Sequence, residues 1–222
     1  MGAQETETET VRALRGLAGS SSSVRLGAAL AIGSAADPGC VDALIERCAI
    51  EPDFHVRDML TWALTRLPPS VTVPKLVEAL ASERGQARSQ ALHTLSKVGD
   101  CRAWPAITRD LLTDADEDVA RSAWRAAVVL VPEGGRAGLA AVLATQLGRG
   151  GHETQLSLSR ALVALGEAVM PVLRDAMTGA DPGVRRHAIA TERLVRDPDA
   201  GFGYAVEEAK RIMVLGATAR EE

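Results

Sequence analysis

Apolar residues recur at intervals of three and four positions along most of the chain, as in the segments "VDALIERCAI" and "VPKLVEALAS". This spacing places them on one face of an α-helix. Short segments with Gly, Pro or Asp interrupt the pattern, at 36–39, 67–70, 98–100, 132–135 and 180–183. Gly and Pro end helices there, and Asp can cap the helix that follows. The pattern therefore predicts an all-α protein built from short helices.

One arrangement of apolar and small residues recurs six times. We call its first residues the anchors, and they are Val24, Val56, Ala87, Val119, Ser157 and Val184. The spacings between anchors are 32, 31, 32, 38 and 27 residues. A second amphipathic segment precedes five of the anchors, at 40–50, 73–82, 103–113, 138–147 and 169–177.

Two helices in about 32 residues cannot bury both of their apolar faces alone, so neighbouring pairs must stack. We predict an α-solenoid of about six helix pairs. The segment 5–19 supplies the first helix of the first pair, and 204–216 forms a capping helix. This divides the chain into an acidic N-terminal segment (1–9), the repeat domain (10–199) and a C-terminal capping helix with a tail (200–222).

Composition agrees with helix and narrows the class of protein. Ala and Leu dominate, whereas aromatic residues make up only 3% of the 222 residues, so helix is favoured over strand. No apolar run approaches the roughly 18–20 residues of a membrane span, and the acidic start does not resemble a secretory signal. The cysteine count is three, an odd number. We therefore expect a reduced cytoplasmic protein without a membrane partner.

Nearly all of the basic residues in the chain are arginines. It has 25 basic residues, and only Lys75, Lys97 and Lys210 among them are lysines. This preference for arginine is typical of carboxylate or phosphate recognition, or it reflects a GC-rich genome. The formal net charge of −4 argues against general affinity for nucleic acid.

No pattern of a catalytic or metal site stands out. The four histidines are His55, His93, His152 and His187, and none has a second His or a Cys at a zinc-binding interval. Nucleophile elbows, phosphate-binding glycine loops and dinucleotide fingerprints are absent from the sequence. We expect no catalytic residues, no metal and no cofactor, and hence a protein that is not an enzyme.

The segments "DFHVRDML", "DEDVARSA" and "DPGVRRHA" share Asp, then Val, then Arg and a small residue. They resemble HEAT repeats, and most of all the short bacterial kind known as PBS-lyase HEAT-like repeats. The resemblance covers roughly residues 10–195. It implies a solenoid whose second helices line the concave side. The family includes scaffolds, adaptors, bilin lyases and DNA-repair enzymes, so the resemblance leaves the function open.

In such repeats Asp and Arg commonly form a hydrogen-bonded ladder between neighbouring pairs. The resemblance assigns this structural role to Asp53, Arg57, Arg88, Asp181 and Arg185, with Arg25 as a further member. Ala120 and Leu158 stand where the arginine belongs in the fourth and fifth pairs. We therefore expect the ladder to be broken there.

Positions two, three and six after each anchor point away from the buried stripe, toward the expected concave side. Asp58 and Trp62 share one helical face there. We predict that this side binds a protein or peptide, with acidic groups where it meets the arginines. The alternative is a solvated face, with Trp62 filling the seam between helices. The predicted partner-binding residues are Asp58, Trp62, His93, Arg121, Arg125, Arg160 and Arg186.

Three functions remain open. The first is a non-catalytic scaffold or adaptor that binds a peptide or protein surface. The second is a DNA-repair protein resembling HEAT-like alkylpurine DNA glycosylases, with Asp58, Trp62, Trp124 and Arg125 as its site. Few aromatic residues and the negative net charge argue against it. The third is a sensory domain that binds a small ligand beside Asp58 and His93.

Overall fold

The structure is a computed structural model that describes residues 2–197, 199 and 201–218. All regular elements within these residues are helices, so the predicted all-α class is confirmed. The helices form two compact bodies. The first body comprises residues 1–108 and 118–130, and the second comprises 109–117 and 131–222. These bodies do not follow the division at residues 9 and 199, which stays a prediction.

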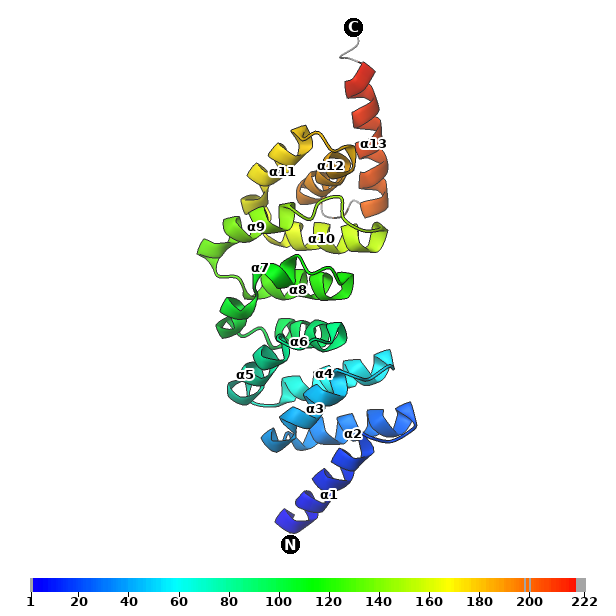
Figure 1. Cartoon of the computed structure of the whole chain (residues 1–222), viewed down its shortest axis with the longest axis vertical. Helices are drawn as coiled ribbons and strands as arrows, with labels where there is room; N and C mark the ends of the chain where they lie inside the picture. Colours follow the sequence, from blue (N-terminus) through cyan, green and yellow to red (C-terminus); the bar gives the residue numbers. More distant parts are fainter. Residues whose placement is uncertain (1, 198, 200, 219–222) are drawn as a thin grey trace. The chain divides into compact units, whose positions relative to one another are not determined.

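The first body holds three complete helix pairs and the second helix of the fourth pair (Figure 1). Within each pair the two helices pack together, and the second helices α2, α4 and α6 pack in succession. The elements are α1 (Gly2–Gly16), α2 (Ser22–Ala35), the 3-10 helix η1 (Pro38–Cys40), α3 (Val41–Cys48), α4 (Phe54–Arg66), α5 (Pro69–Ala79), α6 (Gly85–Val98), η2 (Cys101–Ala106) and α8 (Glu117–Leu130).

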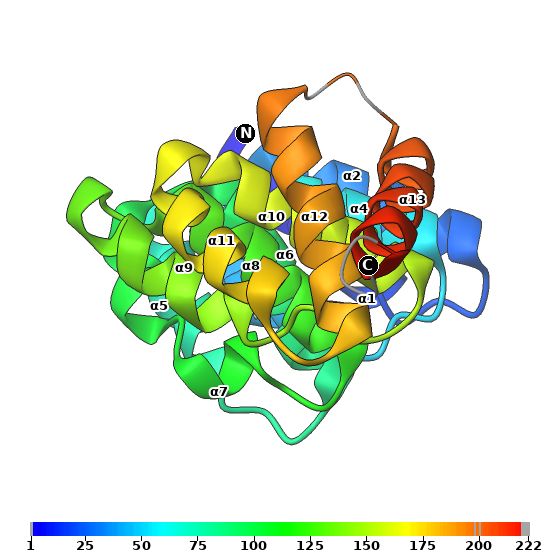
Figure 2. The same ribbon diagram turned by 90° about the horizontal axis from the view of Figure 1, so that it is seen from above.

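The second body continues the same pattern with the fifth and sixth pairs. Its elements are α7 (Arg109–Leu112), η3 (Glu133–Gly135), α9 (Arg136–Ala144), α10 (His152–Ala164), η4 (Gly166–Val169), α11 (Met170–Thr178), α12 (Pro182–Arg196) and α13 (Phe202–Thr218). Both views show α13 beside α12 (Figures 1 and 2). Leu194 and Ala190 of α12 meet Phe202, Ala205 and Ala209 in one buried cluster, so α13 caps the last pair.

One outer helix differs from the expectation. The sequence pattern predicts a continuous helix over 103–113, but the structure has η2 over Cys101–Ala106 and the single turn α7 over Arg109–Leu112. Pro105 lies inside η2. Proline lacks the N–H that a longer helix would need and restricts the residue before it, so the segment forms two short turns instead.

The anchor of the fifth pair also differs. In α10 the buried positions are Thr154, Leu158, Ser159, Ala161 and Leu162. The anchor is therefore Thr154 and not Ser157, which makes the last two spacings 35 and 30 residues. Thr154 can occupy this buried position because its Oγ1 donates a 2.6 Å hydrogen bond to a carboxylate oxygen of Glu117.

The arginine that follows the anchor binds the loop before its own helix. In the first three pairs, Nη1 of Arg25, Arg57 and Arg88 donates to the two carbonyl groups five and six positions earlier, at 2.8 to 3.1 Å. These loop carbonyls have no helical partner, so the guanidinium satisfies them. Each arginine thereby fixes the turn that leads into its helix.

In the fourth and fifth pairs, other side chains donate to the corresponding loop carbonyls. Ala120 follows the fourth anchor and cannot donate, but Arg149 of the fifth pair donates through Nη2 to the carbonyls of Asp114 and Ala115. These two carbonyls lie six and five positions before Ala120. In the fifth pair, Gln155 donates through Nε2 to the carbonyls seven and five positions earlier.

The aspartates of the expected ladder act within their own pairs. The Asp53 carboxylate accepts from the N–H groups of His55 and Val56, and that of Asp181 accepts from the N–H of Val184. Each therefore caps the start of its helix. Arg185 lies partly buried on α12. These two aspartates thus cap their own helices, and the Asp–Arg ladder between neighbouring pairs stays a prediction.

A buried carboxylate joins the first two pairs instead. Glu51, in the loop between α3 and α4, is completely buried. It accepts from Arg25, from Arg47 and from the N–H of Asp53 at 2.7 to 2.9 Å. Burial alone would raise the pKa of Glu51, but these donors lower it to about 2. Glu51 is therefore ionised and fully paired.

No single helix in the described part of the chain is long and apolar enough to cross a membrane. The pair His152–Ala164 and Gly166–Thr178, bent by 120°, reaches that length and composition only when both helices are taken together.

Candidate functional site

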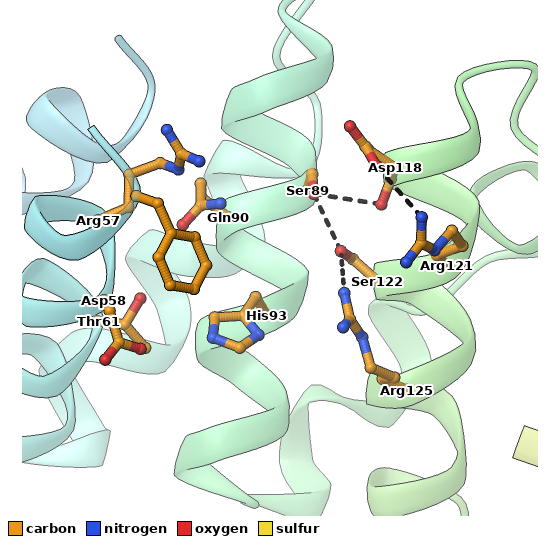
Figure 3. Close-up of a pocket in the computed structure, with 11 residues that line it drawn as sticks. Arg57, Asp58, Thr61, Ser89, Gln90, His93, Asp118, Arg121, Ser122 and Arg125 are labelled. Carbon is orange, nitrogen blue, oxygen red and sulfur yellow. Dashed lines mark hydrogen bonds and ion pairs between the residues drawn. The ribbon is translucent and has the colours of Figure 1, made fainter. Parts of the chain in front are cut away.

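Three successive second helices, α4, α6 and α8, surround a pocket of about 310 Å³ in the first body (Figure 3). On each helix the lining residues lie three or four positions apart, which places them on one face. Most of the lining is polar or charged. It consists of Phe54, Arg57, Asp58, Thr61, Ser89, Gln90, His93, Asp118, Arg121, Ser122 and Arg125.

A chain of hydrogen bonds fixes the α6 and α8 walls (Figure 3). Nη2 of Arg125 donates to Ser122 Oγ at 3.0 Å, the hydroxyls of Ser122 and Ser89 are 2.9 Å apart, and Ser89 donates to the Asp118 carbonyl. Because Ser89 has one hydroxyl proton, Ser122 is the donor between the two serines. Both serines are buried, so they hold the Arg125 guanidinium in place.

The α4 wall presents two polar groups to the pocket. Within the described residues, the exposed Asp58 carboxylate makes no hydrogen bond or ion pair. Thr61, one turn later, is only 3% exposed, and its Oγ1 has no hydrogen-bond partner in the described part of the chain. A buried hydroxyl without a partner costs about 1–3 kcal/mol, which a bound group can recover. Arg57 points away from these two groups in Figure 3.

The α8 wall is positive. Nε of Arg121 is buried without a hydrogen-bond partner among the described residues. Its Nη1 lies 4.0 Å from a carboxylate oxygen of Asp118, whose side chain is 83% exposed, so this ion pair is weak. Desolvation lowers the pKa of the Arg125 guanidinium, and the neighbouring positive charge of Arg121 lowers it further. An anion at this wall would relieve that repulsion.

His93 lies on α6, between the two walls. Burial lowers the pKa of His93, and the charges of Arg125 and Lys97 lower it further, whereas Asp58 acts in the opposite direction. The imidazole is therefore neutral at pH 7. A neutral imidazole has one donor and one acceptor nitrogen, which suits hydrogen bonding to a peptide group.

Trp62 lies outside this pocket lining. It packs in the seam between α2 and α4, where a Cβ atom at Gly33 would lie only 2.5 Å from its Cζ3 atom. Its side chain is 37% exposed. This position, in the seam between helices, was predicted from the sequence as the alternative to partner binding. Trp62 therefore packs at this seam with more than a third of its surface exposed, and its role in partner binding stays a prediction.

Arg160 and Arg186 belong to the second body. Arg160 is exposed on α10 and borders another pocket, of about 330 Å³, with Leu156, Val163 and Phe202 among its lining. Arg186 is partly buried on α12. The structure thus brings Asp58, His93, Arg121 and Arg125 together, and the role of Arg160 and Arg186 in the same partner surface stays a prediction.

Three side chains lie in unexpected places. Trp124 is completely buried, so it cannot stack on a ligand as the DNA-glycosylase alternative requires. His187, expected on the concave side, is also buried. Phe54, an aromatic residue of the kind usually found in a core, is 66% exposed at the rim of the pocket. Thr61 was missed, although its position one turn after Asp58 indicates that it shares the face.

Titratable side chains do not form a metal centre in the described residues: no three His, Cys, Asp or Glu side chains gather there as ligands.

Residues 51–128 match the family model of HEAT repeats. This range contains every residue that lines the pocket, so the resemblance to HEAT repeats drawn from the sequence is confirmed over the part of the chain that builds the site. A comparison with curated proteins gives no match.

Two solved structures have a similar fold. One is the complex of CpcE and CpcF of phycocyanin lyase from Nostoc sp. PCC7120, with a TM-score of 0.50 and 22% identity, covering 84% of this chain and 76% of that chain. The other is human deoxyhypusine hydroxylase in complex with glycerol, with a TM-score of 0.50 and 17% identity, covering 95% of this chain and 97% of that one. At these identities the likeness establishes the helical-repeat fold alone.

Proposed function

We propose that this protein is a non-catalytic interaction module that binds a peptide segment of a partner protein in the pocket of the first body. The observation that carries the proposal is the pocket itself. The second helices of three successive repeats direct charged and hydroxyl side chains into one space. Polar groups on a repeat surface are costly to leave without partners when they are partly buried, and a peptide can supply those partners.

The composition of the pocket supports a peptide over a purely apolar ligand. Its arginines can hold carboxylates, and the neutral His93 can bond to a backbone amide. Such a partner is acidic where it meets Arg121 and Arg125.

We place the module in the cytoplasm. The thiols of Cys40, Cys48 and Cys101 are all free, and the first two are buried. Free thiols suit a reducing compartment.

The test is selection from a displayed peptide library against three proteins. These are the wild type, the Arg121→Glu, Arg125→Glu double variant and an Arg66→Glu control. Arg66 is exposed at the end of α4 and lies outside the pocket lining. We expect peptides that bind the wild type and the control but lose at least ~10-fold in affinity for the double variant, as loss of two ion pairs implies.

Thermal unfolding of each variant establishes that it is folded. If the selected peptides bind all three proteins equally, or if no peptide is selected, this pocket is not the docking site.

A further inference from the structure

The side chains that face into the pocket differ in charge between two of its walls. On α4, Asp58 faces inward while its neighbour Arg57 donates to two loop carbonyls, and on α8 the two arginines outnumber Asp118. Asp58 on α4 is a carboxylate without an ion-pair partner in the described part of the chain, and the hydroxyl of Thr61 next to it has no hydrogen-bond partner there. Arg121 and Arg125 project from α8 on the other side, with His93 between (Figure 3). A ligand with one kind of charge would be attracted to one wall and repelled by the other.

We propose that the pocket selects a dipolar segment, an extended peptide with a basic and an acidic side chain two positions apart. The basic side chain lies at Asp58 and Thr61, and the acidic side chain lies at Arg121 and Arg125. This inference rests on the proposed peptide-binding function and specifies the chemistry of the peptide.

The chemistry of each wall fits its half of the ligand. An ammonium or guanidinium group donates hydrogen bonds, and Asp58 together with Thr61 Oγ1 can accept them. A carboxylate accepts two parallel hydrogen bonds from a guanidinium, and Arg121 has an unused Nε donor within the described residues. The loose 4.0 Å contact between Arg121 and Asp118 offers little competition.

The distance between the helices determines how far apart the two charged side chains of the peptide must be. Neighbouring helix axes lie roughly 8–10 Å apart, so the axes of α4 and α8 are separated by about 18 Å across α6. Side chains reach inward from both walls, so the charged groups lie closer together than the helix axes do. In an extended peptide, residues two positions apart lie on one face with about 7 Å between their Cα atoms. Long Lys and Glu side chains that splay apart then span the pocket.

The test measures fluorescence anisotropy at low ionic strength with four capped peptides. They differ only at two positions, which carry Lys and Glu, two Glu, two Lys or two Gln. The wild type is expected to bind the Lys–Glu peptide about three- to five-fold more tightly than either like-charged peptide. Asp58→Arg is expected to shift the preference to two Glu, and Arg121→Glu, Arg125→Glu to two Lys. Arg66→Glu is expected to keep the wild-type preference.

Two results would overturn the inference while leaving the proposed function intact. One is a wild type that prefers two Glu and does not respond to Asp58→Arg, since the site would then be a simple anion site. The other is equal binding of all four peptides while library-selected peptides still bind. Failure of every peptide, selected or designed, would remove both proposals together.

Discussion

The guanidinium of Arg25 and the carboxylate of Glu51 form two parallel hydrogen bonds, 2.7 and 2.8 Å long, between the first two helix pairs. Arg25 is 7% exposed and Glu51 is not exposed at all. Arg47 and the N–H of Asp53 occupy further acceptor sites of the carboxylate. The charges are therefore removed from water only because each is paired.

Replacing Glu51 by Ala leaves the Arg25 guanidinium buried without its partner. We expect Glu51→Ala to lower the free energy of unfolding by about 3–5 kcal/mol, measured by urea denaturation. Glu78→Ala is the matched control, because Glu78 is 70% exposed and pairs only loosely with Lys75 at 3.6 Å. A loss below about 0.5 kcal/mol is expected for the control. Equal losses in the two variants would contradict the role given to Glu51.

The Gly33–Trp62 contact gives a second prediction. A Cβ at Gly33 would lie 2.5 Å from the Trp62 ring and 2.9 Å from Ala63 Cα. We expect Gly33→Ala to destabilise the protein by about 1–3 kcal/mol through overpacking. Gly27→Ala, in the same helix, is expected to stabilise it by up to about 1 kcal/mol, because Gly27 has no atom within 4 Å of an added Cβ.

The double variant Gly33→Ala, Trp62→Ala tests the cause of that loss. Removal of the ring should recover part of the loss at Gly33, and only part, because the Ala63 backbone remains in place. Strict additivity of the two single variants in thermal unfolding would show that the residues do not pack against each other.

His187 makes stability depend on pH. Its Nδ1 accepts from the N–H of Gly148 at 3.0 Å, so Nε2 carries the proton and faces the Gln155 carbonyl and Ser159 Oγ. Burial lowers the pKa of His187 to about 4, from an ordinary value of 6.5. The unfolded chain therefore binds more protons between these values. The contribution of neutral His187 is complete above pH 6.5 and is lost as the pH falls to about 4.

Between pH 7 and pH 5 this one group should reduce the free energy of unfolding by about 2 kcal/mol. Urea denaturation of the wild type and of His187→Gln at both pH values checks this. We expect the wild type to lose more stability on acidification than the variant. A wild type and variant with the same pH dependence would assign the effect to other groups.

Arg149 gives a fourth prediction, in the second body. Its guanidinium supplies hydrogen bonds to the carbonyls of Asp114 and Ala115. Arg149→Ala is expected to lower the free energy of unfolding by about 1–3 kcal/mol, because the partly buried Asp114 carbonyl loses a charged donor. Arg174→Ala, at an exposed position of α11, is the control and should change stability by less than about 0.5 kcal/mol. Similar losses in the two variants would show that the bonds of Arg149 contribute nothing.

Helical periodicity was sufficient to predict the fold class and most of the repeat register. It could not locate the fifth anchor, because Thr154 is polar and is accepted in the interior only through its bond to Glu117, 37 residues away in sequence. It also could not foresee the break in the outer helix over 103–113. There the local effect of Pro105 outweighs the apolar pattern.

The residues of the candidate site were predictable from the sequence where their position depends only on the face of their own helix. Asp58, His93, Arg121 and Arg125 face one pocket because each lies on the same face of its own helix. Trp62 and Trp124 were ambiguous because their surroundings depend on other helices. A glycine in α2 admits the Trp62 ring, and the Trp124 side chain is completely buried. No pattern within a single helix contains that information.

The turn before the second helix of the fourth pair receives its hydrogen-bond donor from the fifth pair, and this has an evolutionary consequence. HEAT arrays change length by gain or loss of whole repeats, and a self-sufficient repeat can be copied or removed without harm to its neighbour. The turn at Asp114 and Ala115 lacks this independence, because its donor is encoded 34 or more residues later, at Arg149. A natural or engineered junction between the fourth and fifth repeats therefore removes this donor, and an arginine at position 120 would supply it from within the fourth repeat.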